Sequence, residues 1–495
     1  MIRSWPNCAR GDGSVVPAPP PRLLRVRSSR RFILVAVCVS VFTDIFLYGI
    51  IVPVLPFAIA SRAAVPEPDV QYWISVLLAV YGVAILVTSP ISGWYADRSS
   101  SRRLPLLIGL LALAGATILL CLARSVALLV TGRILQGMGD AVVWTVGQAL
   151  LVDTVGQRDI GQVLGYVSIS MTLGVLLAPL LGGVVYSHAG YYPVFYMAFG
   201  LILVDAFLRL SLVEKKIAAQ WIEKKDVATP PSNTETGSKQ IQAVARPTAN
   251  PQGSNSRMYP PVFTLLLSRR LLAALWGCMV QGSVMTALDS VLPLFVQRVF
   301  NWNSTGAGLA FIPFIIPSVA APLVGAISDR YGPRWLIVAG FLFVIPPFAL
   351  LRLVTENTLD QKILFCSLLS LIGIALTLVT PPLMAEITYV VEAKEKKRPG
   401  IFGNTGAYAQ AYGLFVMAWA AGSLCGPLWA GLVQDRTDWA TMTWTFSLFS
   451  GLGALPALIW TGGLITEKNA KNGCERSTGG SADKPEDGGL GAREV

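Results

Sequence analysis

The chain has 495 residues, of which 53% are hydrophobic and only 14% are charged, and it carries a formal net charge of +11. Soluble domains carry about 25% charged residues, and a water-exposed surface cannot be covered with so few charges. The composition therefore excludes an ordinary soluble protein and indicates a membrane protein. Basic residues stand in short runs between apolar segments, so we expect contact with an anionic lipid leaflet and no binding of nucleic acid.

Metal and nucleotide chemistry find little support in the sequence. The one histidine, His188, has no potential metal ligands near it, and the seven cysteines show no Cys-x-x-Cys spacing. A phosphate-binding glycine loop that ends in Gly-Lys-Ser or Gly-Lys-Thr is absent from the sequence. We expect no enzyme and no metal site.

Apolar stretches with few or no charges recur along the chain. About 20 apolar residues cross a bilayer as a helix. Twelve stretches meet this length: 32–57, 70–96, 104–123, 126–152, 161–187, 191–213, 271–296, 299–328, 335–351, 363–385, 405–433 and 440–465. The sequence therefore predicts an all-α integral membrane protein with 12 transmembrane helices.

Polar segments divide these spans into two sets of six. Residues 214–260 are rich in Pro, Ser, Asn, Gln and Lys, which predicts a disordered linker between bundles 32–213 and 261–466. Tails 1–31 and 467–495 flank the bundles, and the second tail is expected to be disordered. Lys and Arg concentrate in loops on one side, which predicts that both termini and the linker are cytoplasmic. Asn303 begins an Asn-Ser-Thr sequon on the other side, where glycosylation is permitted.

The two halves repeat two short motifs. Gly93-Trp-Tyr-Ala-Asp97-Arg98 follows the second span, and Gly325-Ala-Ile-Ser-Asp329-Arg330 follows the eighth. The fifth span carries Gly174-Val-Leu-Leu-Ala-Pro179-Leu-Leu-Gly182-Gly183, and the eleventh carries Gly422-Ser-Leu-Cys-Gly426-Pro427. Both repeats fall at equivalent spans of their halves, which indicates internal duplication.

These motifs resemble signatures of the major facilitator superfamily over nearly the whole chain. Gly93, Asp97, Arg98, Arg102 and Arg103 match the loop 2–3 signature. Arg133-Ile-Leu-Gln-Gly is similar to a span-four motif of proton-coupled members, and the span-five motif is similar to that of drug:proton antiporters, with Ala178 where Gly is usual. The surroundings of Asp44 resemble span one of vesicular amine transporters, which also carry acids where this chain has Asp289 and Glu392.

The resemblance implies two pseudo-symmetric six-helix bundles around a central cavity. It also implies a secondary active transporter that exports a small organic solute by proton-coupled antiport, with protons as the coupling ion and no cofactor. A drug, toxin, secondary metabolite or amine is the expected solute class. A monomer in the plasma membrane is expected, or alternatively in a vacuolar or other organellar membrane. The alternatives are a proton-independent uniporter or importer of a metabolite, and a transporter-like sensor or scaffold.

Ionisable residues inside the apolar spans carry the most functional information, because a charge in the bilayer centre is costly. The candidates for substrate or proton coupling are Asp44, Arg133, Asp140, Asp289, Glu386 and Glu392. Asp44, Arg133 and Asp140 are expected to form one polar cluster. Burial favours a neutral carboxylic acid and a nearby arginine favours the carboxylate, and a coupling site needs this competition.

Each of these acids has a predicted role in transport and a structural alternative. Asp44 would pair with a cationic amine, with Asp289 as its counterpart in the other half. Glu386 and Glu392 would serve a proton relay or an inner gate. For each acid the alternative is a structural ion pair, and for Asp205 and Arg209, spaced i,i+4, a local pair is favoured.

The repeated motifs suggest conformational gating. Gly93 would let two helices approach, Asp97 would accept hydrogen bonds from a neighbouring helix end, and the arginines would clamp lipid phosphate or acids across the two halves. The alternative is a simple positive-inside anchor. The small residues and Pro179 of span five would favour antiport, or else serve packing only. Tyr48, Trp144, Tyr408 and Tyr412 are candidates for lining the cavity.

Overall fold

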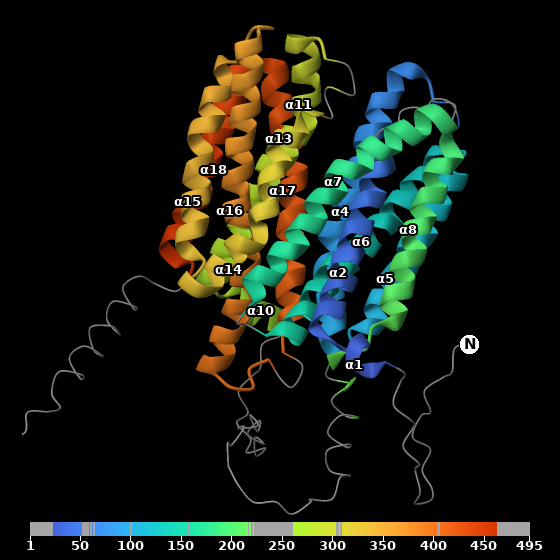
Figure 1. Cartoon of the computed structure of the whole chain (residues 1–495), viewed down its shortest axis with the longest axis vertical. Coiled ribbons are helices and arrows are strands. Elements are labelled where there is room, and N and C mark those ends of the chain that lie inside the picture. The colour runs from blue at the N-terminus through green and yellow to red at the C-terminus, as the bar shows by residue number, and fades with distance from the viewer. Residues whose placement is uncertain are drawn as a thin grey trace, which may run out of the picture.

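The computed structural model describes residues 23–51, 65–99, 101–156, 159–215, 261–302, 309–402 and 406–462, with a few single positions between these segments. Within these residues the chain is helical and contains no strand. Figure 1 shows two helical bundles side by side, the first coloured blue to green and the second yellow to red.

Twelve described helices are long and apolar enough to cross a membrane, which confirms the expected number. The first bundle comprises α2 (Arg30–Ile51), α4 (Glu67–Arg98), α5 (Arg103–Leu122), α6 (Val126–Val155), α7 (Ile160–Ala189) and α8 (Tyr191–Ser211). The second comprises α11 (Arg269–Phe300), α13 to α14 (Phe311–Ile315, Ile316–Ala320 and Ala321–Tyr331), α15 (Arg334–Leu350), α16 (Leu359–Lys397), α17 (Tyr408–Arg436) and α18 (Trp439–Trp460). Short helices α1 (Leu24–Arg27) and α10 (Pro261–Leu266) precede the two bundles.

Three predicted boundaries were wrong, and each error has a local cause. Helix α11 continues to Phe300 and ends where Asn301 adopts a left-handed conformation with φ 54°, so the eighth span begins at Phe311 instead of residue 299. The charge-free stretch 299–328 runs through this turn, so charge did not mark it. Helix α16 extends to Lys397, beyond the expected 363–385. The prediction marked only the apolar stretch, and the helix continues through the charged residues that follow it. Helix α18 ends at Trp460 instead of residue 465.

The expected linker also begins with ordered residues. Glu214 is buried, and its carboxylate accepts hydrogen bonds from the Arg103 backbone N–H at 2.8 Å and the Ser101 hydroxyl at 2.5 Å. The packed structure therefore continues past the predicted boundary at residue 214. Residues 222–260, 463–495 and 1–22 lie outside the described residues, as does Asn303.

One end of the two bundles collects the basic loops. Helices α1 and α10 lie at this end, as Figure 1 shows, together with the loop after Arg98, the loop before Arg334 and the loop after Lys397. We call this end the basic face and the other end the opposite face. Helices α2 and α11 run away from the basic face, and α6 and α16 run toward it.

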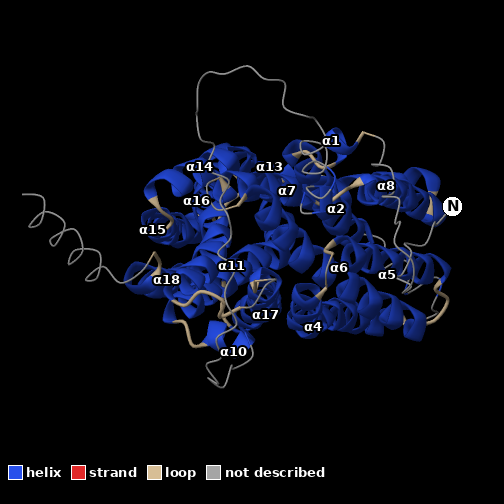
Figure 2. Ribbon diagram, turned by 90° about the horizontal axis from the view of Figure 1, so that it is seen from below, coloured by secondary structure: helices blue, strands red, loops and turns tan. Residues whose placement is uncertain are grey.

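The bundles meet along two pairs of helices. Helix α4 packs against α17, and α7 packs against α14; Figure 2 shows these pairs at two edges of the junction. Glycines permit the approach: a Cβ at Gly93 would lie 2.5 Å from the Ala409 carbonyl oxygen, and a Cβ at Gly325 would overlap Gly161. Small residues therefore bring the backbones of the two halves into contact.

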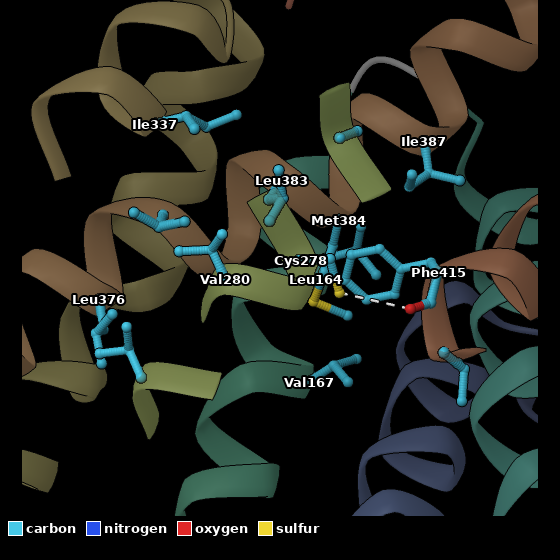
Figure 3. Packing of buried hydrophobic residues seen from close by; sticks show 14 of the residues in the cluster. Leu164, Val167, Cys278, Val280, Ile337, Leu376, Leu383, Met384, Ile387 and Phe415 are labelled. Atoms are coloured by element: carbon cyan, nitrogen blue, oxygen red, sulfur yellow. Dashed lines mark hydrogen bonds between the residues drawn. The ribbon is translucent and has the colours of Figure 1, made fainter. Parts of the chain in front are cut away.

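Apolar side chains fill the junction toward the basic face. Leu164 and Val167 of α7 belong to the same buried cluster as Cys278, Met384 and Phe415 of the second bundle, and Figure 3 shows them close together. The Cys278 thiol donates to the Phe415 carbonyl oxygen at 3.5 Å. These contacts join α7 of the first bundle to α11, α16 and α17 of the second.

A buried ion pair ties α8 to its neighbours. The Arg209 Nη2 and Asp205 Oδ2 atoms lie 2.5 Å apart, with 3% and 0% of the two side chains exposed. The Ser40 hydroxyl donates to Asp205 at 2.6 Å, and Arg209 Nη1 donates to the Leu106 carbonyl oxygen at 2.7 Å. The prediction of a local pair is confirmed. The full set of partners explains how the bundle tolerates two buried charges.

Removal of one partner of this pair should be costly. We expect Arg209→Gln to lower the free energy of unfolding by about 3–5 kcal/mol, because Asp205 is left buried without its counter-charge. Denaturant unfolding in detergent micelles measures this. The control is Arg30→Gln, which breaks an exposed pair with Asp159 at 2.8 Å and should change the free energy by less than about 1 kcal/mol. Equal effects of the two changes would contradict the assignment.

Candidate functional site

Two buried carboxyl groups face each other inside the first bundle. Asp44 of α2 and Asp140 of α6 are each 1% exposed, and their side chains interact directly. The Tyr81 hydroxyl of α4 donates to Asp140 Oδ2 at 2.5 Å. Neither carboxyl oxygen of Asp44 accepts a hydrogen bond from a described residue. The pair has no cation within ion-pair distance in the described part of the chain.

The depth of the two acids explains why they meet. Asp44 lies fourteen residues from Arg30 at the start of α2, and Asp140 lies fifteen residues from Val155 at the end of α6. At about 1.5 Å per residue, both lie about 21–23 Å from the basic ends of their helices. Antiparallel neighbours therefore place them at one level.

Arg133 interacts electrostatically with Asp140 but forms no ion pair with either acid. Seven residues separate Arg133 from Asp140, which is about 10 Å along α6 toward the opposite face. Its Nη1 donates to Gln136 Oε1 at 2.9 Å. Its guanidinium lies 5.5 Å from the centre of the Tyr48 ring and 5.8 Å from that of Tyr81. Cation–π contact therefore replaces the ion pair.

Further polar atoms without partners lie on the same two helices. The side chains of Thr43, Thr145 and Gln148 are buried, and their polar atoms make no hydrogen bond with described residues. Two nitrogens of the Arg133 guanidinium, Nε and Nη2, are also buried without a hydrogen bond to a described residue. Buried polar groups are normally hydrogen-bonded to protein or water. The centre of the first bundle is therefore suited to binding water, protons or a polar solute.

Asp289 faces this region from the second bundle. It lies in the middle third of α11, yet its side chain is exposed, and it interacts electrostatically with Tyr48. The Tyr48 and Tyr81 rings stack with centroids 4.6 Å apart. Asp289 therefore lies on the side of α11 that faces Tyr48 of the first bundle. Tyr48 interacts electrostatically with both Asp289 and Asp140.

A small cavity with a mostly apolar lining lies between the halves. Its volume is about 40 Å³, and its walls come from α7, α11, α14 with the turn before it, α16 and α17. Hydroxyl groups of Ser168, Thr172, Ser318, Thr377 and Thr380 line it, with Met285 one helical turn before Asp289. The volume suffices for one or a few water molecules.

The loop 2–3 motif forms a contact between the halves. One Asp97 carboxylate oxygen accepts from the Ala409 N–H at 3.1 Å, and the other accepts from the Gln410 N–H at 2.9 Å. Both donors lie in the first turn of α17, where backbone N–H groups have no partner within the helix. The positive end of the helix dipole adds to the attraction.

The second half makes the same contact in the other direction. Asp329 accepts from the N–H groups of Gly161 at 2.7 Å and Gln162 at 2.9 Å, in the first turn of α7. The Tyr389 hydroxyl donates to it at 2.6 Å. Each half therefore presents an aspartate to a helix N-terminus of the other. We call these two contacts the Asp97 latch and the Asp329 latch.

The loop 2–3 arginines do not pair with acids of the other half, so that form of the expected clamp was wrong, and contact with lipid phosphate stays a prediction. Arg102 bonds Asp97 at 2.9 Å and Asp153 at 3.1 Å, both in its own half. Arg98 lies over the ring of Trp94, Arg330 lies over Tyr331, and Arg103 donates to the Leu210 carbonyl oxygen. Among these arginines, Arg102 alone supports the Asp97 latch, and it does so by orienting the carboxylate.

Glu386 and Glu392 lie away from the Asp44–Asp140 pair. Glu386 is fully buried and forms a two-pronged ion pair with Arg270, whose Nη2 lies 2.8 Å from Oε2. Its Oε1 also accepts from the Gly462 N–H at 2.8 Å. This geometry matches the structural alternative for Glu386. Glu392 is half-buried near the basic end of α16, and its Oε2 has no partner among the described residues.

The small residues of spans five and eleven have different surroundings. A Cβ at Gly174 would lie 2.8 Å from Ile45, one at Gly182 would lie 2.7 Å from the Ile50 carbonyl oxygen, and one at Gly426 would overlap Ser283. Gly183 faces open space. Pro179 is exposed and Pro427 is half-buried, and both lie inside unbroken helices. Most of these glycines pack helices within one half.

The prediction that Tyr412 lines the cavity was wrong. Its side chain is fully buried, shares a hydrogen bond of 2.9 Å with the Thr388 hydroxyl and also lies 3.1 Å from the Met384 carbonyl oxygen. Tyr48, Trp144 and Tyr408 are partly exposed. Sequence reasoning missed Tyr81 and the helix N-termini at Ala409 and Gly161. Tyr81 lies in a charge-free span, and no local signal marks it as the partner of Asp140.

Comparison with known proteins agrees with this geometry. The family model of the Major Facilitator Superfamily matches residues 37–406 and 312–477. An MFS-type transporter of Schizosaccharomyces pombe, described as uncharacterized, is 33% identical over 437 residues, which cover 88% of this chain and 96% of the relative. The MFS-type transporter ppzB of Metarhizium rileyi is 32% identical over 470 residues, with 89% and 96% covered. The chain therefore belongs to the Major Facilitator Superfamily of multi-pass membrane transporters.

More distant relatives share the same architecture. The human vesicular acetylcholine transporter is 24% identical over an alignment of 499 positions, gaps included, which covers 90% of this chain and 85% of that protein. A crystal structure of the human organic anion transporter MFSD10 (TETRAN) matches with a TM-score of 0.63 and 16% identity, over 86% of this chain and 99% of the other. The predicted fold and the resemblance to this superfamily are confirmed.

The Asp97 latch can be tested by hydrogen–deuterium exchange. We expect Asp97→Ala to accelerate amide exchange at Ala409 and Gln410 about 10- to 100-fold, because a hydrogen bond to a charged group contributes about 1.5–3 kcal/mol. Mass spectrometry of peptides from the start of α17 measures this. Asp159→Asn, a change of an exposed acid on the basic face, should leave these peptides unchanged. Exchange that is unaffected by Asp97→Ala would disprove the latch.

Proposed function

We propose that this transporter exports a small organic solute by proton-coupled antiport and alternating access. The observation that carries the proposal is the Asp44–Asp140 pair, two buried carboxyl groups in contact without a described cation within ion-pair distance. Like charges at such distance in a low-dielectric interior disfavour double ionisation. A proton or a cationic solute can relieve the repulsion, and the two compete because either one suffices. Such competition is the basis of exchange.

Asp289 and the stacked rings of Tyr48 and Tyr81 complete the proposed binding site for a cationic solute. Asp289 is exposed on the side of α11 that faces Tyr48 and can attract a cation there. The Tyr48 and Tyr81 rings stack, Tyr81 donates a hydrogen bond to Asp140, and Tyr48 interacts electrostatically with Asp289. Arg133 lies near the same rings and interacts electrostatically with Asp140. A cation that approaches Asp140 therefore competes with Arg133, which can help to release it.

The latches define the conformation in the proposed cycle. Both are formed, and apolar packing fills the junction on the basic side. By the positive-inside rule the basic face is cytoplasmic, so the structure corresponds to a state closed toward the cytoplasm. Asp97 and Asp329 would release α17 and α7 when the transporter turns inward. We assign the protein as a monomer to the plasma membrane, with a vacuolar or other organellar membrane as the alternative.

The energy of coupling is modest but sufficient. One pH unit is worth about 1.4 kcal/mol per proton, which sustains a roughly tenfold solute gradient. A membrane potential contributes about 2.3 kcal/mol per charge per 100 mV when net charge moves. An amine is a suitable solute, since the human relative is named for acetylcholine, a quaternary ammonium cation. The drug, toxin and secondary-metabolite classes remain within the proposal.

Asp44→Asn should abolish coupling. We expect solute-dependent proton movement to fall to the level of empty vesicles, because an amide neither binds nor releases a proton in this range. Purified protein in liposomes that contain a pH-sensitive dye, with candidate amines added outside, measures this movement. Asp360→Asn, a change of an exposed acid at the start of α16, is the control and should keep full coupling. Solute flux without proton movement in the unmodified protein would instead support the uniporter.

Asp289→Asn should affect cationic and neutral solutes differently. We expect the KM for a cationic solute to rise at least about tenfold, which corresponds to about 1.4 kcal/mol of lost attraction. A neutral solute of similar size should keep its KM, because no charge pairing is lost. Radiolabelled uptake into vesicles with an imposed pH gradient provides both values. Equal changes for the two solutes would show that Asp289 acts on conformation and not on the charge of the solute.

A further inference from the structure

A long apolar groove lies at the surface where the second bundle meets α4. Its volume is about 760 Å³, and its walls come from α10, α11, α17 and α18 with Leu86 of α4. Leu272 and Trp276 of α11 line it and are 47% and 36% exposed. The groove therefore opens sideways toward the bilayer, and Asp289 does not line it.

The depth of the groove matches one leaflet. Arg269 is the first residue of α11 and Trp460 is the last of α18, so both stand at the basic face. Met279 lies ten residues further along α11, about 15 Å deeper at about 1.5 Å per residue. The hydrocarbon core of a bilayer is about 30 Å thick, and one leaflet takes about half of it. The groove thus runs from headgroup depth to the bilayer centre.

Charge is confined to the shallow end of the groove. Arg269 is the one charged residue among the described residues that line it, it is exposed, and it forms no ion pair with a described acid. The adjacent Arg270 is already paired with Glu386. Below Arg269 the lining consists of Leu, Ala, Met, Trp and Pro side chains. A cation above an apolar channel is complementary to a lipid whose phosphate group sits above its acyl chains.

We propose that this groove binds one anionic phospholipid from the leaflet on the basic face. The phosphate pairs with Arg269, and an acyl chain lies along Leu272, Trp276 and Met279. The indole of Trp460 lies at the headgroup level, where tryptophan is favoured. Because Leu86 belongs to the first bundle and the other lining residues to the second, the bound lipid contacts both halves beside the junction of α4 with α17.

The test uses the full-length protein in liposomes of phosphatidylcholine doped with a photoreactive phosphatidylserine that carries a diazirine in its acyl chain. After illumination, mass spectrometry maps the labelled peptides. We expect labels concentrated on the first half of α11 and on the segment of α17 around Met417 to Ala421. Arg269→Gln should reduce this labelling at least about fivefold, and Arg269→Lys should retain most of it, because Lys keeps the charge.

Two further variants make the outcome decisive. Leu272→Trp fills the groove from a half-exposed position and should reduce labelling to a similar extent while the protein stays monodisperse. Arg31→Gln is the matched control, because Arg31 is also exposed at the basic face and does not line the groove. The proposal is overturned if Arg31→Gln lowers labelling as much as Arg269→Gln. It is equally overturned if a photoreactive phosphatidylcholine labels the same peptides to the same extent, or if labels spread evenly over the lipid-facing helices.

Discussion

The pairing of an aspartate in each half with a helix N-terminus of the other half organises this molecule. Asp97 and Asp329 satisfy backbone N–H groups that have no partner inside α17 and α7. The contacts need glycines at the crossing points, because any larger residue at Gly93 or Gly325 would push the backbones apart. They are few, charged and local, so they can break together while each bundle stays intact. In the proposed cycle these contacts would form the element that opens and closes the basic face.

Buried charge in each bundle follows one of two patterns. Asp205 with Arg209 and Glu386 with Arg270 are fully partnered, as expected for structural pairs. Asp44 and Asp140 pair two acidic groups with each other, and Asp289 is exposed in the middle third of α11 without a described ion-pair partner. Incomplete satisfaction is costly in a membrane interior. We infer that the incompletely partnered acids are the ones retained for transport.

The surface groove is explained by a second constraint, the need for lipid to fill the outer surface of a membrane protein. A membrane transporter that rocks two bundles against each other must keep its outer surface filled with lipid in every state. At the junction of α4 with α17 the groove leaves a gap too deep for side chains to fill, and a cation stands at its headgroup end. A specifically held lipid would seal this gap and contact both moving parts.

The sequence by itself determined the twelve spans, because lipid imposes a length and a polarity that a single chain displays. The superfamily followed from the resemblance of its short motifs to family signatures. The sequence also singled out Asp44, Asp140 and Asp289, since charges stand out in apolar stretches. Tertiary structure alone decided their partners. Tyr81, the stacked Tyr48 and the N-termini of α7 and α17 carry no local signal, because their roles arise from distant segments brought to one depth. For the same reason Arg133 pairs with rings instead of acids, and Glu386 joins Arg270.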